Sequence, residues 1–262
     1  MTSPGESPMV VAKNDADFDD WDRHWKDIEK TMAMNPAHEY RRSILFRNLN
    51  LASVPSPRVL DVGSGLGDFL IALSDQYPEV PKLGLELAQT GVDIASRRLP
   101  QATFLQRDLI AGSEGPGAYA KFATHAVCSE VLEHVDDPVR LLENARAYMA
   151  KGCRLVITVP GGPRSALDRH IGHRRHFTPA SLREVLNEAG FTVLSAVGAG
   201  FPFFNLYRLL VILRGNKLID DAASEPSYLL RFSCAVFRVC FKLNSDNSRF
   251  GWQIVAIATN ND

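Results

Sequence analysis

The stretch Val59-Leu-Asp-Val-Gly63-Ser-Gly65-Leu-Gly67-Asp68 decides the fold class of this 262-residue chain. An apolar run ends in three closely spaced glycines, and an amphipathic run follows from Phe69. Glycine is needed where the backbone turns sharply and where a ligand approaches it, because a side chain would clash there. The pattern predicts a strand, a ligand-binding turn and a helix.

Short apolar runs alternate with amphipathic runs on both sides of this stretch, which is typical of a doubly wound α/β sheet. Strands are predicted at 58–62, 82–86, 103–106, 123–128, 153–159, 191–197 and 252–258. Helices are predicted at 69–76, 90–98, 138–149 and 179–189.

The pattern divides the chain into five parts. Residues 1–16, rich in Pro, Ser and acids, are expected to be disordered. Residues 17–54 are expected to form N-terminal helices, and 55–200 a Rossmann-like core. Residues 201–248, rich in Leu and aromatics, are predicted to be a helical lid inserted before the closing strand at 249–262. The apolar faces of the N-terminal helices comprise Phe18, Trp21, Trp25, Ile28 and Met32, and then Tyr40, Ile44, Leu45 and Leu49.

Composition excludes several classes of protein. The 29 Lys and Arg residues balance 30 Asp and Glu residues, and 45% of the chain is hydrophobic, which fits a globular protein without a general affinity for nucleic acid. The four cysteines form no CxxC pair, so we expect reduced thiols and a cytoplasmic location. The apolar run 201–213 is short and broken by Arg208, so no stable membrane insertion is expected.

Polar residues follow three further predicted strands, at the edge of the sheet where α/β proteins bind ligands. Glu86 ends the second strand, where a carboxylate can accept from both ribose hydroxyls of a nucleoside. Asp108 follows the third strand, within reach of an adenine amino group, and the run Cys128-Ser-Glu-Val-Leu-Glu-His134 follows the fourth. Alternatively, Asp61 is a helix cap, Glu86 a solvated carboxylate and Asp108 a turn residue.

The same turn argues against an NAD-dependent oxidoreductase. A dinucleotide fingerprint has a third small residue at the position that Asp68 occupies, and the third glycine, Gly67, comes one residue early. The spacing therefore weakens the interpretation as an NAD-binding turn.

The motifs VLDVGSGLG, LGLEL, LQRDL and SEVLEH, in this order and spacing, resemble those of the class I S-adenosylmethionine-dependent methyltransferases. The branch is that of small-molecule enzymes similar to those of quinone biosynthesis. The resemblance covers residues 40–200 and the closing strand. It implies a seven-stranded sheet of order 3-2-1-4-5-7-6 with an antiparallel last strand, and S-adenosyl-L-methionine as cofactor.

The resemblance also implies roles for residues at the strand ends. Glu86 would bind the ribose, Leu87 would pack on adenine, and Asp108 with the Leu109 backbone would read the adenine edge. The residues implied for the methionine part are Asp61, Gly63, Ser64, Gly65 and Ser129.

Four neighbouring residues have two open interpretations each. Arg41 or Arg42 either reaches the cofactor carboxylate as a fork-shaped donor or is a surface arginine. Glu130 and Glu133 either contact the ligand or cap a helix and face solvent.

For methyl transfer, the protein has to place the acceptor in line with the methyl group, and an acceptor with a hydroxyl group also benefits from a general base. Two histidines are candidate catalytic bases, because imidazole titrates in the right range. His134 follows the fourth strand, and His173 lies in the segment 168–177 after the fifth; for His134, capping a helix or meeting a backbone carbonyl is the alternative.

The segment 168–177 carries histidines at every third position, interleaved with arginines. It resembles the GHxRxY-type segment of the same branch, with Phe177 where Tyr is frequent. Three-residue spacing in a loop does not make imidazoles converge, so no metal site is predicted. The arginines either bind an anionic group on the acceptor or pair with Asp168 and Glu184.

The sequence thus predicts a methyltransferase for a small lipophilic or aromatic molecule, with oxygen favoured as the acceptor atom. A cofactor-binding regulatory module is the alternative without catalysis. RNA methylation is disfavoured because the sequence has no stripe of basic residues that would bind RNA. An apolar stripe in the insertion is expected to line the acceptor pocket, with its own core or a homodimer face as alternatives; its members are Phe201, Phe203, Phe204, Leu206, Tyr207, Leu210 and Val211.

Overall fold

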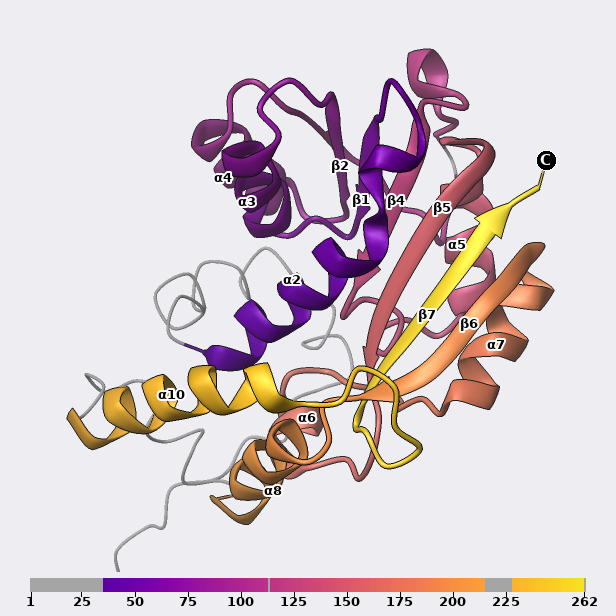
Figure 1. Cartoon of the computed structure of the whole chain (residues 1–262). Helices are drawn as coiled ribbons and strands as arrows, with labels where there is room; N and C mark the ends of the chain where they lie inside the picture. The colour runs from indigo at the N-terminus through magenta and orange to yellow at the C-terminus, as the bar shows by residue number, and fades with distance from the viewer. Residues whose placement is uncertain (1–34, 113, 215–227, 262) are drawn as a thin grey trace, which may run out of the picture.

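Strand β1 (Val59–Val62), which ends in the glycine turn, lies in the middle of a seven-stranded sheet of order β3-β2-β1-β4-β5-β7-β6. The structure is a computed structural model that describes residues 35–112, 114–214 and 228–261. The other strands are β2 (Lys82–Glu86), β3 (Thr103–Gln106), β4 (Ala123–Ser129), β5 (Met149–Pro160), β6 (Phe191–Ala199) and β7 (Gln253–Asn260). The first five pair in parallel and β7 is antiparallel to both neighbours, so the predicted order and the antiparallel last strand are confirmed (Figure 1).

Helices cover both faces of this sheet, because alternate strand residues point to opposite sides. Val59 belongs to the apolar cluster under α2 (Pro36–Leu49), α3 (Asp68–Gln76) and α4 (Gln89–Arg98). Its neighbour Leu60 belongs to the cluster under α5 (Pro138–Arg146) and α7 (Pro179–Glu188) on the other face. The predicted apolar face of α2 is confirmed: Tyr40, Ile44, Leu45 and Leu49 are all buried.

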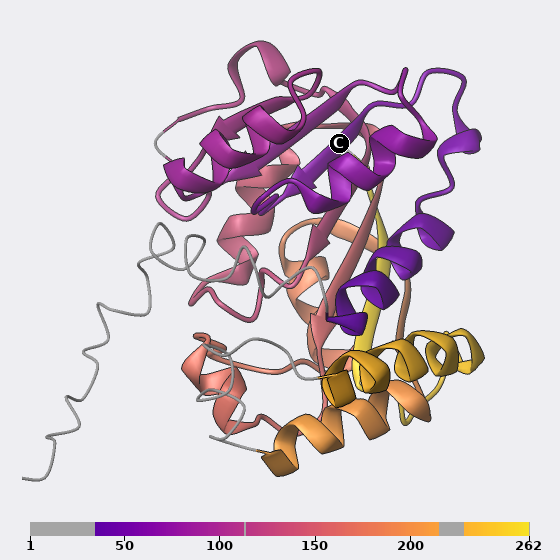
Figure 2. The same cartoon turned by 90° about the vertical axis from the view of Figure 1, so that its left-hand side faces the viewer.

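The insertion between β6 and β7 contains α8 (Phe203–Arg214) and α10 (Tyr228–Cys240), followed by the short η4 (Phe241–Leu243). α8 and α10 pack against each other, and α10 also packs on α2 (Figure 2). Phe204 was expected in an acceptor pocket, but it is 1% exposed and its ring packs 5.3 Å from that of Tyr40 and 5.7 Å from that of Phe241. Phe204 is therefore a core residue that fixes α8 to α2.

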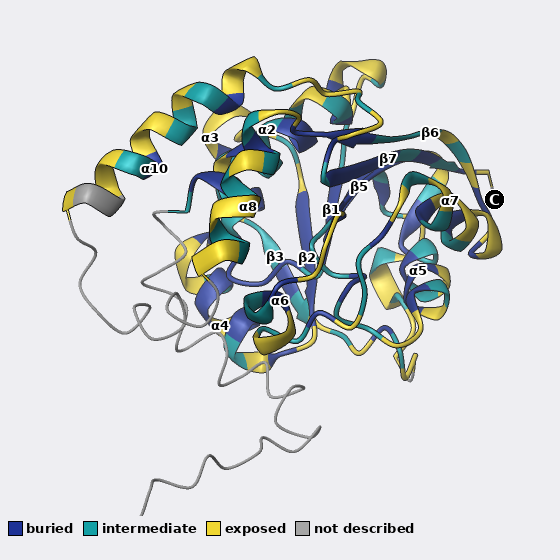
Figure 3. Ribbon diagram, turned by 90° about the horizontal axis from the view of Figure 1, so that it is seen from below, coloured by how far each residue is buried: buried dark blue, intermediate teal, exposed yellow. Residues whose placement is uncertain are grey.

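The outer face of α8 carries an apolar stripe that is open to solvent (Figure 3). Its members recur at three- and four-residue steps, which places them on one side of a helix. They are Leu206, Leu209, Leu210 and Leu213, which are 47%, 41%, 44% and 72% exposed. The predicted stripe is thus divided between a buried side and an exposed side.

The largest boundary difference from the sequence prediction lies between α5 and β5. The helix expected to reach Met149 ends at Arg146, because Met149 pairs with Ala123 and begins β5. A short helix, α6 (Ala166–His170), follows β5 and begins with a capping box between Ser165 and Asp168. The predictions for residues 1–16 and for a helix over 17–34 lie outside the described residues. Across the described ranges, no helix has both the length and the hydropathy to cross a membrane.

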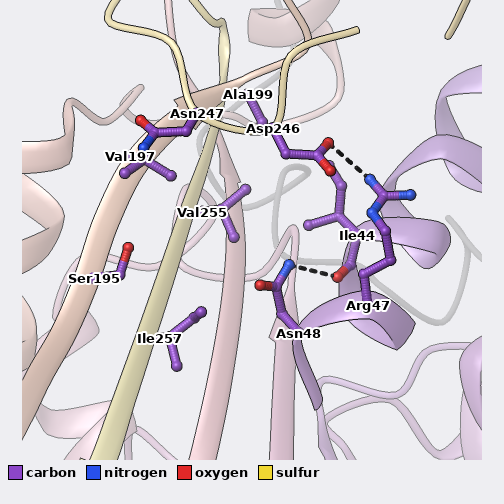
Figure 4. Close-up of a pocket in the computed structure, with 10 residues that line it drawn as sticks. All are labelled: Ile44, Arg47, Asn48, Ser195, Val197, Ala199, Asp246, Asn247, Val255 and Ile257. Carbon is purple, nitrogen blue, oxygen red and sulfur yellow. Dashed lines mark hydrogen bonds and ion pairs between the residues drawn. The ribbon is translucent and has the colours of Figure 1, made fainter. Parts of the chain in front are cut away.

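A hollow of about 220 Å³ lies between α2 and the strands β6 and β7 (Figure 4). Arg47 pairs with Asp246 at 2.8 Å on its rim, and Ser195 and Val197 line it from β6. None of the predicted cofactor-binding or catalytic residues lines this hollow.

Candidate functional site

A larger cavity of about 700 Å³ opens at the carboxyl ends of β1, β2 and β4. Parallel strands that point the same way place their terminal residues on one rim, which is why residues distant in sequence meet here. All residues predicted for the cofactor and for catalysis line it: Asp61, Gly63, Ser64, Gly65, Glu86, Leu87, Asp108, Leu109, Ser129, His134 and His173. The structure therefore brings the whole predicted set together, and the role of each residue stays a prediction.

The glycine turn after β1 presents backbone groups to this cavity. Gly63 has a φ of 73°, and a Cβ there would lie 2.4 Å from the Val131 side chain. The amides of Gly63 and Ser64 both donate to the Leu85 carbonyl, at 2.8 and 2.9 Å, which ties the turn to β2. Only glycine fits that position, since φ is left-handed and the space is filled.

The Glu86 carboxylate closes the turn from the side of β2. It is 6% exposed and accepts from the Gly65 amide at 2.9 Å and from the Ala88 amide at 3.0 Å. A carboxylate offers about four acceptor positions in all, which suits it to bind a diol in addition to backbone amides. Leu87 beside it is 44% exposed on the rim, which suits a partner with an apolar face.

Asp61 is a buried carboxyl at the end of β1, 4% exposed. Burial, and then the charges of Glu86 and Asp68, raise the pKa of Asp61 to about 8. A cationic group in the cavity would favour the ionised form and reverse this shift. The site is therefore suited to a ligand that carries an ammonium group beside Asp61.

Two further predicted residues are partly engaged by the protein itself. Asp108 is exposed, and its Oδ1 accepts from the amides of Ile110 and Ala111, both at 2.9 Å, so it also caps a turn. The Ser129 hydroxyl lies 2.7 Å from the Thr158 hydroxyl of β5. The Asp108 carboxylate and the Ser129 hydroxyl can each accept a further hydrogen bond from a ligand.

Glu130 joins the rim to two other elements. It has a φ of 57°, unusual for a residue with a side chain, as is found at functional sites. Gln253 of β7 donates to Glu130 Oε1 at 2.9 Å, and Arg41 of α2 lies 3.5 Å from Oε2. Arg41 and Arg42 both line the cavity, so both remain candidates for an anionic group of the ligand.

The two candidate bases lie edge to face, with ring centroids 4.7 Å apart. Burial, followed by the neighbouring His134 ring, lowers the pKa of His173 to about 2. His173 Nδ1 lies 3.2 Å from His176 Nε2, whereas His170 of the same segment is exposed. The two candidate bases thus pack against each other at one wall of the cavity, and this wall disfavours a charge on His173.

Sequence reasoning missed the ion pair between Asp168 and Arg208. The guanidinium donates to both carboxylate oxygens, at 3.0 and 2.9 Å, and Asp168 is 1% exposed. Burial alone would raise the pKa of Asp168, but the hydrogen bonds and charge of Arg208 outweigh it and hold this pKa below its usual range. The signal in the sequence was the single arginine within the apolar run 201–213, because a lone charge there needs a buried partner. The pair anchors α8 over the cavity.

Two arginines of the segment 168–177 contact the loop that follows the site residues of β4. Arg175 donates to the carbonyls of Val135 and Asp136, at 3.1 and 2.8 Å, and Arg174 pairs with Asp136. Phe177 is 4% exposed within the main core, so an apolar ring suits that position.

Two groups of side chains have ligand atoms within 4.8 Å of one another, namely Glu133, His134 and His173, and Asp168, His173 and His176. In the second group the Arg208 guanidinium already occupies both oxygens of Asp168, which disfavours a cation there. That no metal binds remains a prediction for both groups.

A family model described as a methyltransferase domain matches residues 37–196, which is more than half of the chain. This chain belongs to that methyltransferase family. The match spans the glycine turn, the strand-end acids and both candidate bases.

Curated relatives include O-methyltransferases. The chain is 29% identical over 189 residues to malonyl-[acyl-carrier protein] O-methyltransferase of Paenibacillus sp. (strain JDR-2), a match that covers 64% of this chain and 65% of the relative. It is 28% identical over 162 residues to the ubiquinone biosynthesis O-methyltransferase of Psychrobacter arcticus, covering 54% and 61%. The chain thus spans less than two thirds of the length of each.

The fold is also that of solved methyltransferases. The geranyl diphosphate C-methyltransferase of Streptomyces coelicolor A3(2), solved with S-adenosyl-L-homocysteine, superposes with a TM-score of 0.53 at 15% identity, over 84% of this chain and 77% of that one. At this identity the likeness bears on the fold alone. The cofactor of the family is S-adenosyl-L-methionine.

The carboxyl of Asp61 gives a pH-dependent prediction for cofactor binding. If the cofactor's ammonium group lies beside Asp61, binding ionises a carboxyl whose pKa is about 8 and releases a proton. Affinity for S-adenosylhomocysteine should then rise about tenfold per pH unit from about pH 6 and level off above about pH 8.

The Asp61→Asn variant is the control, because the ligand's own titration is the same for both proteins. It should bind about 1.5–3 kcal/mol more weakly and lose the part of the pH dependence due to Asp61. Calorimetric titrations that gave parallel pH curves for the two proteins would place the ammonium group elsewhere.

Proposed function

We propose that this protein is an S-adenosylmethionine-dependent O-methyltransferase that acts on a small lipophilic or aromatic molecule with a hydroxyl group. The observation that carries the proposal is that one cavity contains both the strand-end carboxylates and the paired histidines. The O-methyltransferases among the curated relatives support oxygen as the acceptor atom.

The wall opposite the glycine turn supports an acceptor with apolar character. Leu167 and Ile171, from α6 and the residue that follows it, line the cavity together with Tyr207 and Val211 of α8. Apolar side chains with few polar groups are typical of pockets for small organic molecules. Because the ion pair of Asp168 and Arg208 fixes α8, this wall is preformed.

The residues of the chain perform binding, orientation and proton transfer. The cofactor supplies an activated methyl group when it is bound. Asp61 and the glycine turn would hold its methionine part, while Glu86 and Leu87 would hold the ribose and adenine. The apolar wall places the acceptor and excludes water, and His134 or His173 accepts the hydroxyl proton as the new bond to oxygen forms.

Two alternative functions from the sequence analysis can be separated from the proposed one. An NAD-dependent oxidoreductase is not favoured, because the family match and the Asp68 position both oppose it. A regulatory module without catalysis would bind cofactor, yet it would not need a pair of histidines at the cavity wall. Methyl transfer from labelled S-adenosylmethionine to hydroxylated aromatic and isoprenoid compounds separates them.

The apolar wall gives a prediction about acceptor affinity. Replacing Val211 by Ser removes roughly 1 kcal/mol of apolar contact, which should raise the KM for the acceptor about fivefold without changing cofactor affinity. Leu210→Ser is the matched control on the same helix, since Leu210 is 44% exposed and does not line the cavity. If Leu210→Ser raises KM while Val211→Ser does not, the acceptor binds on the outer face of α8.

The histidine pair gives a prediction about rate. Replacing the histidine that acts as base by Ala should lower kcat about 10²–10⁴-fold with cofactor affinity intact, because the hydroxyl proton then has no acceptor. His170→Ala, from the exposed histidine of the same segment, should leave kcat unchanged. If His134→Ala and His173→Ala both keep the wild-type kcat, placement alone drives methyl transfer.

A further inference from the structure

Glu133 carries a buried carboxyl that the predicted functions leave unused. It is 0% exposed, and no other described residue gives either of its oxygens a hydrogen bond. A buried polar group without a partner destabilises the fold, and such groups in native proteins usually have a catalytic or ligand-binding reason. The sequence-based alternatives, a helix cap or a solvated side chain, both fail for this residue.

The two candidate bases flank this carboxyl. Glu133 Oε1 lies 3.9 Å from Nε2 of His134 and 4.0 Å from Nε2 of His173. These distances exceed a hydrogen bond by about 1 Å, so a small shift on ligand binding would join the groups directly. His134 and His173 line the cavity, whereas Glu133 lies behind them.

Hydrogen bonding fixes the tautomer of His173. The Gly162 carbonyl can only accept, so His176 Nδ1, 3.0 Å away, carries a proton. Neutral His176 therefore has a bare Nε2, and His173 Nδ1 donates to it across 3.2 Å. The remaining nitrogen of His173, Nε2, is then bare and faces Glu133, so a protonated carboxyl there has an acceptor.

The surroundings favour the protonated form of Glu133. Burial and then the charge of Glu130 raise the pKa of Glu133 well above its usual value, and Asp168 adds to the shift. The backbone amide of Glu133 itself and the charge of Arg41 oppose it without reversing it. Burial and then the charge of Glu133 raise the pKa of the Cys128 thiol, so this thiol stays protonated beside the group. At rest, Glu133 is thus a carboxylic acid and the His173 beside it a neutral imidazole.

We propose that Glu133 is a positioning residue that acts with His134 and His173 as a proton relay behind the acceptor. The acceptor's O–H bond breaks as its oxygen bonds to the methyl carbon and the carbon–sulfur bond breaks. The released proton goes to the imidazole of His134. Glu133 gives its own proton to Nε2 of His173, which leaves one carboxylate between two imidazolium rings.

This relay explains why the unpartnered carboxyl is retained. A lone imidazolium in this buried wall would be poorly stabilised, since His173 already disfavours a charge. A carboxylate that appears only when the proton arrives stabilises the charged state and leaves the resting state neutral. The relay rests on the proposed function for the source of the proton, but its resting state can be tested without any acceptor.

The first experiment is infrared difference spectroscopy of wild type against Glu133→Gln at neutral pH. The variant keeps the shape of the side chain and removes the acid. We expect the wild type to show the carbonyl stretch of a protonated carboxylic acid that the variant lacks. Glu184→Gln is the control, because Glu184 is exposed and should contribute no such band. A difference spectrum without that band would overturn the relay, since Glu133 would then be ionised at rest; the Asp61 carboxyl is common to both proteins and cancels.

The second experiment is steady-state methyl transfer. Glu133→Gln should lower kcat about 10²-fold or more, with the acceptor KM and cofactor affinity unchanged, and Glu133→Asp should restore part of the loss. A wild-type kcat in Glu133→Gln would contradict the relay, as would a stoichiometric divalent metal lost on that substitution. If wild type transfers no methyl group, the proposed function fails, and the infrared result still decides whether Glu133 holds a proton.

Discussion

The hydrogen bonds of one buried carboxylate, that of Glu86, hold the cofactor end of the site together. Glu86 ends β2, yet it accepts from the amide of Gly65 in the turn after β1 and from Ala88 before α4. The approach is close: a Cβ on Gly91 would lie 2.9 Å from Glu86 Cγ. A charged acceptor on backbone amides is among the stronger hydrogen bonds of a protein. Turn, strand and helix are thereby fixed around the place where a ribose would bind.

A second charged contact fixes the acceptor end. Arg208 extends from α8 to Asp168, which begins α6 together with Ser165. Removing one partner of such a buried pair leaves an uncompensated charge, which is why the pair holds an inserted helix in place. The insertion is therefore part of the site wall through Tyr207 and Val211, while its outer leucines face solvent.

Much of the fold followed from local pattern, because alternating runs and turn glycines report directly on backbone geometry. The bounds of β2 and β3 agree with the prediction to the residue. The boundary between α5 and β5 differs from the prediction, since Met149 becomes a strand residue only through its pairing with Ala123. Phe204 was assigned to the pocket because an apolar helical stripe does not reveal which of its sides meets the core.

The same distinction holds for the site: some of its residues could be predicted from local pattern, and others depend on the tertiary structure. Residues at strand ends were predictable, because parallel strands bring their carboxyl ends to one rim whatever the loops do. The burial of Glu133 and the pairing of Asp168 with Arg208 depend on loops that meet only in the folded chain. Sequence could place His134 and His173 near the rim, but it could not show that they share one carboxyl.

The most direct test of this account is calorimetric titration of S-adenosylhomocysteine and of NAD into wild type and Glu86→Gln. The amide keeps one acceptor for the backbone and loses the charge that would hold both ribose hydroxyls. We predict one S-adenosylhomocysteine per wild-type chain, binding weaker by about 1–3 kcal/mol in Glu86→Gln, and no NAD binding to either. Equal affinity for S-adenosylhomocysteine in both proteins, or tight binding of NAD alone, would contradict it.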